Sequence, residues 1–125
     1  MNLFNEEIVK VLNDYFSKES QFLESIQLAS YGFNIQFVNF NIQCNERVFA
    51  SIEGTRYEWD DAPNSGPWGM LGRQCAENAS LKSPSVLSIK FESGDSIDIE
   101  TVESQYESVI FNFPPLGNSL VMEIF

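Results

Sequence analysis

Residues 32–43 read GFNIQFVNFNIQ, and this stretch decides the fold class. Its hydrophobic side chains alternate with asparagine and glutamine, which is typical of a β-strand that turns one face toward the core. The alternation changes phase at Phe37 and Val38, where two hydrophobic residues are adjacent. Such a change predicts either a β-bulge or a strand that is covered on both faces.

The chain before this stretch follows a helical period instead. Residues 3–16 carry hydrophobic side chains at steps of three and four, with charged and polar residues between them. Asn2 or Asn5 can cap the helix that this spacing predicts. After a break near residues 17–20, the same hydrophobic face is expected to continue through Phe22, Leu23 and Ile26.

The chain after this stretch predicts strands separated by turns. Residues 48–59 are typical of a long strand interrupted by Gly54, with one face made by Phe49, Tyr57 and Trp59. Residues 60–84 contain several glycines and prolines and have no clear period. Alternating segments return at residues 86–91, 96–100, 106–113 and 119–125, with a turn at 92–95.

These elements predict a single α+β domain over residues 1–125, in which an N-terminal helical segment packs on a mainly antiparallel sheet of about five or six strands. Hydrophobic residues make up 43% of the chain, which is enough for a core. No hydrophobic run has the length of a membrane span, and the N-terminal residues lack the basic start of a signal peptide. We therefore expect a cytoplasmic protein.

The chain contains no histidine, and this argues against most catalytic chemistry. Histidine is the usual general base near neutral pH and a ligand of most catalytic zinc and copper sites. Cys44 and Cys75 do not make a zinc site without histidine, and we expect them to be buried free thiols. We therefore expect neither an enzyme nor a bound cofactor or metal. The alternative is an enzyme that uses a pair of carboxylates, with candidates Glu58, Asp60 and Asp61.

Negative charge is the strongest feature of the composition, with 18 acidic residues, 7 basic residues and a formal net charge of −11. Such a chain is expected to repel nucleic acid and anionic membranes, because both are bound through cationic contacts to phosphate. A basic protein would instead be attracted to it. Against this interpretation, acidity can simply keep a protein soluble.

The acidic residues form two groups along the sequence, and both have aromatic residues close by. One group lies within residues 92–107, which contain no lysine or arginine, and the other lies within residues 53–61. If both lie on one side of the sheet, the carboxylates would steer a basic partner and the aromatic side chains would anchor it. The residues expected to contact this partner are Glu58, Trp59, Asp60, Asp61, Trp68, Asp95, Asp98, Glu100, Glu103, Tyr106 and Glu107.

The opposing interpretation makes these residues a solvated outer strand face, with the aromatic side chains in the core. Trp68 distinguishes the two interpretations. It lies in the stretch GPWGMLG (66–72), which matches no phosphate-binding loop. If Trp68 is buried, the loop around it is mostly structural, and we expect the docking face on residues 92–107.

The late segment VLSIKFESGDSIDIETVESQYESVIFNF (86–113), a hairpin followed by a strand, is similar to segments of bacterial immunity proteins. These proteins belong to toxin–immunity systems, which include contact-dependent growth inhibition. The short, acidic α+β chain as a whole also resembles them. The resemblance implies a protein that binds one cognate toxin domain and blocks its active site or substrate surface. With this charge, the implied toxin is a basic nuclease, a tRNase before a DNase.

Three functions from different classes therefore stay open. An immunity protein binds its basic partner stoichiometrically and without turnover, and salt slows the association. An inhibitor that mimics nucleic acid requires acidic residues spaced like phosphates over the whole surface, whereas here they are concentrated in two segments. A small enzyme requires a pocket in which carboxylates with raised pKa values converge. The oligomeric state of the free chain, a monomer or otherwise, is left open.

Overall fold

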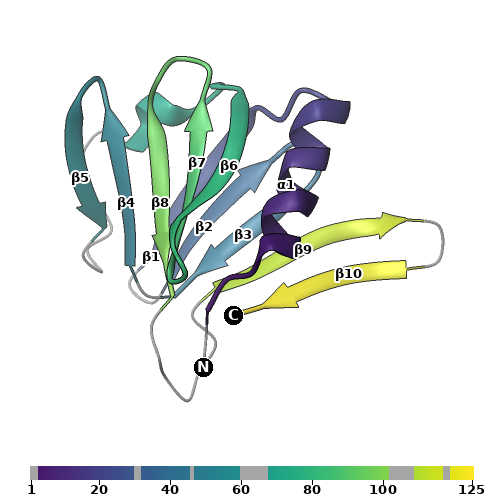
Figure 1. The fold of residues 1–125 in the computed structure, drawn as a ribbon. Coiled ribbons are helices and arrows are strands. Elements are labelled where there is room, and N and C mark those ends of the chain that lie inside the picture. The colour runs from purple at the N-terminus through teal and green to yellow at the C-terminus, as the bar shows by residue number, and fades with distance from the viewer. Residues whose placement is uncertain (1–2, 30–31, 46, 60–67, 102–108, 117–118) are drawn as a thin grey trace.

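A computed structural model describes residues 3–29, 32–45, 47–59, 68–101, 109–116 and 119–125. Over these residues the chain forms an α-helix, a short 3-10 helix and ten strands, and the strands make two antiparallel sheets that pack face to face (Figure 1). The predicted α+β class, with an N-terminal helix packed on antiparallel sheet, is confirmed. Within the same residues, no helix has both the length and the hydrophobicity needed to cross a membrane.

Each sheet has five strands, and their inner faces enclose one hydrophobic core. Sheet I consists, in spatial order, of β1 (Leu23–Ala29), β2 (Gly32–Phe37), β3 (Asn41–Cys44), β9 (Val109–Leu116) and β10 (Ser119–Ile124). Sheet II consists of β5 (Thr55–Trp59), β4 (Arg47–Ile52), β8 (Ser96–Glu100), β7 (Val86–Phe91) and β6 (Ala76–Ser83). The helices are α1 (Glu6–Lys18) and the 3-10 helix η1 (Trp68–Leu71).

Helix α1 confirms the helical period of the N-terminal segment. The Asn5 side chain accepts a hydrogen bond from the Ile8 amide at 3.0 Å and so caps the first turn. Ile8 and Leu12 are buried, and Tyr15 stacks on Phe113 of sheet I. The helix lies along β6, at the side of the sandwich where sheet II ends (Figure 1).

Asn13 connects this helix to the edge strand β6. Its side-chain amide donates a hydrogen bond to the Ala79 carbonyl at 3.0 Å, and its side-chain oxygen accepts one from the Ala79 amide at 2.7 Å. Edge strands expose backbone groups that can pair with another chain. Because Asn13 occupies such a pair of groups, the helix protects the edge of sheet II as well as covering the core.

We expect Asn13→Ala to lower the free energy of unfolding by about 1–3 kcal/mol, because both backbone groups of Ala79 lose their partner. Alanine is the better helix former, so a change in helix propensity would act in the opposite direction. Urea unfolding measures the loss, and hydrogen exchange at the Ala79 amide should accelerate with it. Asn112→Ala is the matched control, because Asn112 donates to the side chain of Asn41 and not to backbone. An equal loss in both variants would contradict the role given to Asn13.

The expected continuation of the helix after residue 20 is wrong, because residues 23–26 belong to β1. This strand pairs with β2, and its register shifts between Leu23 and Ser25. Such a β-bulge adds one residue, so Leu23 and Ile26 face the same side of the sheet although they are three positions apart. A step of three is also a helical step, and the hydrophobic pattern could not distinguish the two.

The change of phase at Phe37 and Val38 is a reversal of the chain, so neither the predicted bulge nor a continuous strand is present. Strand β2 ends at Phe37, and the Phe37 amide donates to the Phe40 carbonyl at 2.9 Å across the turn. Phe37 and Phe40 are both buried, whereas Val38 is exposed at the turn. The hydrophobic positions therefore change from odd to even numbers while the core stays on the same side.

A second reversal, at Gly54, corrects the face assigned to Trp59. Glu53 and Gly54 have φ values of 51° and 84°, and this two-residue turn joins β4 to β5. Trp59 consequently pairs with Val48 and faces the core, whereas Phe49 lies on the outer face. The prediction that Phe49 and Trp59 share a face is wrong because a turn, and not a continuous strand, separates them.

Candidate functional site

The outer face of sheet II gathers side chains of both charges. Four of the seven cationic residues lie there, namely Arg47, Arg56, Lys82 and Lys90. Three carboxylates lie among them, those of Glu58, Asp98 and Glu100. The face is therefore nearly neutral, although it holds three of the acidic residues predicted to contact a partner.

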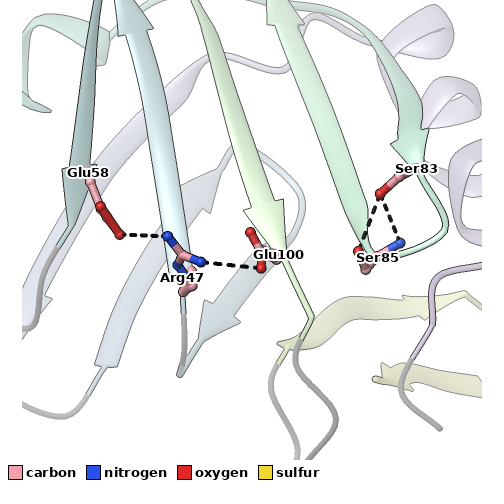
Figure 2. A network of polar contacts seen from close by, with 5 residues as sticks. All are labelled: Arg47, Glu58, Ser83, Ser85 and Glu100. Atoms are coloured by element: carbon pink, nitrogen blue, oxygen red, sulfur yellow. Dashed lines mark hydrogen bonds and ion pairs between the residues drawn. The ribbon is translucent and has the colours of Figure 1, made fainter.

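Arg47 lies between two of these carboxylates (Figure 2). Its guanidinium group is 3.2 Å from Glu58 on β5 and 3.6 Å from Glu100 on β8. The guanidinium groups of Arg47 and Arg56 also lie over the ring of Phe49, 5.0 Å and 4.5 Å from its centroid. Both carboxylates are thus partly neutralised within the chain, and the Phe49 ring is covered.

Asp98 is the buried carboxylate of this face, with 1% of its surface exposed. The Lys82 ammonium nitrogen and an Arg56 guanidinium nitrogen lie 2.6 Å and 3.1 Å from its Oδ2 atom. Burial alone would raise the pKa of Asp98, but hydrogen bonds from Lys82, Ser88 and Arg56 outweigh burial and lower it. The ionised carboxylate therefore joins β8 to both edge strands of sheet II, β5 and β6.

Trp59 and Trp68 lie in the hydrophobic core, 4% and 2% exposed. The ring of Phe33 on β2 contacts both, with centroids 5.7 Å from Trp59 and 5.0 Å from Trp68. Trp68 is the first residue of η1 and fixes this short helix to the core. The segment that begins at Trp68 is therefore structural, which is the outcome that places the expected docking face on residues 92–107.

Asp95 is turned inward and connects three loops. Its Oδ1 atom accepts a hydrogen bond from the Glu53 amide at 3.0 Å, and its Oδ2 atom accepts one from the Gln74 side chain at 2.8 Å. Gln74 also donates to the Met70 carbonyl and accepts from the Ser93 hydroxyl. The Asp95 carboxylate thus ties the β4–β5 turn to η1 and to the β7–β8 turn.

Five of the predicted contact residues lie outside the residues that the structure describes, namely Asp60, Asp61, Glu103, Tyr106 and Glu107. Of the other six, three carboxylates come together on the outer face of sheet II, each beside a cation. Asp95 lies apart from them at the end of the sheet, and the two tryptophans lie in the core. The assignment of these residues to a partner stays a prediction.

A different surface was not identified from the sequence, at the end of the sandwich where α1 and β7 end (Figure 1). The β2–β3, β4–β5 and β7–β8 turns reach this end together with η1 and the start of β1. Three of the five exposed large hydrophobic residues lie here, Phe22 (45% exposed), Val38 (37%) and Met70 (48%). The exposed carboxylates of this end include Glu24, Glu53 and Glu92. We name these six residues the turn-end surface.

Cys44 and Cys75 are free thiols. Cys44 is buried, and burial raises its pKa. Cys75 is partly buried, and its pKa is raised by burial and then by the neighbouring Glu92 carboxylate. Both thiols are therefore protonated near neutral pH. Over the residue ranges given above, no group of three histidine, cysteine, aspartate or glutamate side chains could hold a metal ion.

Comparisons with protein-family models, curated proteins and solved structures gave no match for this chain. Function is therefore inferred from the charges, buried groups and exposed side chains of the chain itself.

Proposed function

We propose that this chain is an immunity protein that binds a cognate basic toxin domain, a tRNase or a DNase, and blocks its active site or substrate surface. The observation that carries the proposal is the unequal distribution of charge. The outer face of sheet II contains four of the 7 basic residues and three of the 18 acidic residues. The rest of the chain therefore has three basic and fifteen acidic residues.

A surface with this excess of carboxylates attracts cationic partners over long distances. Uncharged amides occupy much of the outer face of sheet I, where Asn34, Gln36, Asn41, Gln43 and Asn112 lie. The acidic residues are thus left mainly to the helix, the turns and the loops. A nuclease carries a cationic cleft because it binds phosphate groups. An acidic protein can occupy such a cleft in place of nucleic acid, and long-range attraction speeds the encounter.

A carboxylate-dependent enzyme has less support. A carboxyl group that acts as a general acid near neutral pH needs a raised pKa. Asp98 is the most buried carboxylate of the described residues, and its pKa is lowered, because hydrogen bonds from Lys82, Ser88 and Arg56 outweigh the effect of burial. This group is suited to hold strands together and not to donate a proton.

The proposal is tested with the domain encoded at the C-terminus of the reading frame directly upstream. We expect this domain and the chain to form a complex of fixed stoichiometry, measured by size-exclusion chromatography with mass detection. An equimolar amount of the chain should abolish the nuclease activity of the domain without consuming either protein. A nuclease domain from an unrelated toxin serves as the control and should stay active. Full activity of the upstream domain beside an equimolar amount of the chain would refute the proposal.

We expect the association rate of this complex to fall by about tenfold or more between about 0.05 M and 0.5 M NaCl, because salt screens attraction between exposed charges. The dissociation rate should change much less, since contacts at short range are screened less than the long-range field. Stopped-flow fluorescence measures both rates. Sodium sulfate at matched ionic strength is the control for effects specific to chloride. An association rate that does not depend on salt would contradict the electrostatic part of the proposal.

A further inference from the structure

We infer that the partner, a basic protein domain, docks on the turn-end surface, which consists of Phe22, Glu24, Val38, Glu53, Met70 and Glu92. This inference rests on the proposed function and locates it on the molecule. The partner would present lysine and arginine side chains around a hydrophobic contact.

Backbone hydrogen bonds join the segments that carry this surface. Phe22 pairs with Cys75 in a β-bridge, and the Cys75 carbonyl accepts a hydrogen bond from the Glu92 amide at 3.0 Å. The side-chain oxygen of Gln21 accepts a hydrogen bond from the Asn39 amide at 3.1 Å. This last bond fixes the β2–β3 turn next to Phe22. The start of β1, the β2–β3 turn and the β7–β8 turn therefore form one connected surface.

The remaining two segments are joined through Asp95. This carboxylate accepts hydrogen bonds from the Glu53 amide and from the Gln74 side chain, and Gln74 donates to the Met70 carbonyl at 2.9 Å. Met70 and Glu53 are therefore held in fixed positions relative to the β7–β8 turn. The six side chains come from five separate segments, yet they share one framework.

The hydrophobic part of this surface has the properties of a contact site. The side chains of Phe22 and Met70 are 45% and 48% exposed, and a hollow of about 460 Å³ lies beside Phe22, lined also by Leu23, Glu24 and Arg73. Exposed hydrophobic residues that are grouped together and surrounded by charge are typical of protein–protein contacts. The hollow can receive a side chain of the partner.

Charge complementarity determines which kind of partner fits. Five exposed glutamates lie at this end of the sandwich, against two exposed cations, Lys18 and Arg73; the glutamates are Glu19, Glu24, Glu53, Glu77 and Glu92. Ion pairs within 4 Å involve only the outer face of sheet II in the part of the chain that the structure describes. The carboxylates of sheet II are thus neutralised by their own neighbours, whereas those at the turn end are available to an external cation. A basic domain matches the turn end better than it matches sheet II.

Octalysine is the first probe, because its charge resembles that of the inferred partner and it requires no knowledge of the toxin. The ¹⁵N-labelled chain is titrated with this peptide at low salt, and the amide shifts are mapped. We expect the largest shifts at the turn-end surface, including Glu24, Glu53 and Glu92. Shifts centred on Phe49 and Ser51 of sheet II, or spread evenly along α1, would overturn the inference.

Charge reversal tests the acidic part of the surface with the upstream toxin domain as ligand. We expect Glu24→Lys/Glu92→Lys to weaken binding by about 100-fold. Glu7→Lys/Asp14→Lys is the matched control, because it makes the same change in net charge on exposed positions of α1. The control should stay within about threefold of the wild-type affinity, since a distant charge contributes mainly through the screened long-range field.

Truncation tests the hydrophobic part. We expect Phe22→Ala/Met70→Ala to weaken binding by about tenfold or more, because exposed side chains that become buried in a contact carry much of its affinity. Leu3→Ala/Ile124→Ala removes the two other exposed large hydrophobic residues, which lie near the chain termini at the opposite end (Figure 1). This control should bind like the wild type. Urea unfolding of all four double variants confirms that each is folded before binding is compared.

The outcomes separate the surface from the function. Equal losses in the variants and their controls would overturn the turn-end assignment and leave the immunity function standing. The same conclusion follows if Asp60→Lys/Asp61→Lys abolishes binding while Glu24→Lys/Glu92→Lys does not. If the wild-type chain fails to bind the upstream domain, the immunity function is wrong, and the octalysine map alone decides whether this end receives basic ligands.

Discussion

Trp68→Ala should lower the free energy of unfolding by about 3–5 kcal/mol, the largest loss that we expect from a single substitution in this chain. The Trp68 side chain is 2% exposed, and its ring lies 5.0 Å from that of Phe33. Removal of the indole ring leaves a cavity where η1 meets β1 and β2, and the surrounding strands cannot move inward to fill it. Urea denaturation followed by circular dichroism measures the loss.

Met70→Ala is the matched control, because Met70 lies two positions further along η1 and is 48% exposed. We expect its free energy of unfolding to stay within about 0.5 kcal/mol of the wild type. A comparable loss in both variants would show that η1 as a whole, and not the burial of the Trp68 ring, determines the stability of this region.

Asp98→Asn should lower the free energy of unfolding by about 1–3 kcal/mol at pH 7, because Lys82 and Arg56 lose a charged hydrogen-bond acceptor. The pKa of Asp98 in the folded chain is lowered from the ordinary value of 3.8, since hydrogen bonds from Lys82, Ser88 and Arg56 outweigh burial. The stabilisation from its charge is therefore complete above pH 3.8 and is lost as the pH falls through the lower, folded-state pKa. The difference between wild type and variant should narrow accordingly.

Unfolding curves recorded from pH 7 down to pH 2.5 test this dependence, given sufficient stability in acid. Glu100→Gln is the matched control, because Glu100 is on the same strand and pairs with Arg47 at the longer distance of 3.6 Å. That pair is more exposed, so we expect its removal to cost less than about 1 kcal/mol. A constant difference between Asp98→Asn and wild type over the whole range would contradict the assigned ionisation of Asp98.

Local patterns predicted the helix and the β7–β8 turn, whereas short reversals caused the errors of register. The steps of three and four in residues 3–16 persist for several turns, and α1 follows them. The two-residue turns after Phe37 and Ile52 each moved the hydrophobic positions by one, which resembles a bulge or an uninterrupted strand. Strand β6 has the sequence AENASLKS and no clear alternation, because its conformation depends on pairing with β7 and on cover by α1.

The candidate site was harder to predict, because its contacts join residues that are far apart in the sequence. The carboxylates of Glu58 and Glu100 were recognised as acidic, but Arg47 reaches both only because β4 lies between β5 and β8. Phe22 and Met70 likewise belong to segments that carry no common motif and meet through Cys75 and its neighbours. The one local signal for the turn-end surface is Val38, which is hydrophobic and out of phase with the preceding strand.

The hydrogen bonds of Asp95 imply that the turn end is already shaped before any encounter. Loops that become ordered on binding lose conformational entropy, and this loss weakens the complex. Here one carboxylate holds the Glu53 backbone at a φ of 51° and fastens it to the neighbouring loops in the free chain. A docking domain would therefore meet a rigid template. Variation within the contact would then change mainly how long the partner stays, and much less how often an encounter succeeds.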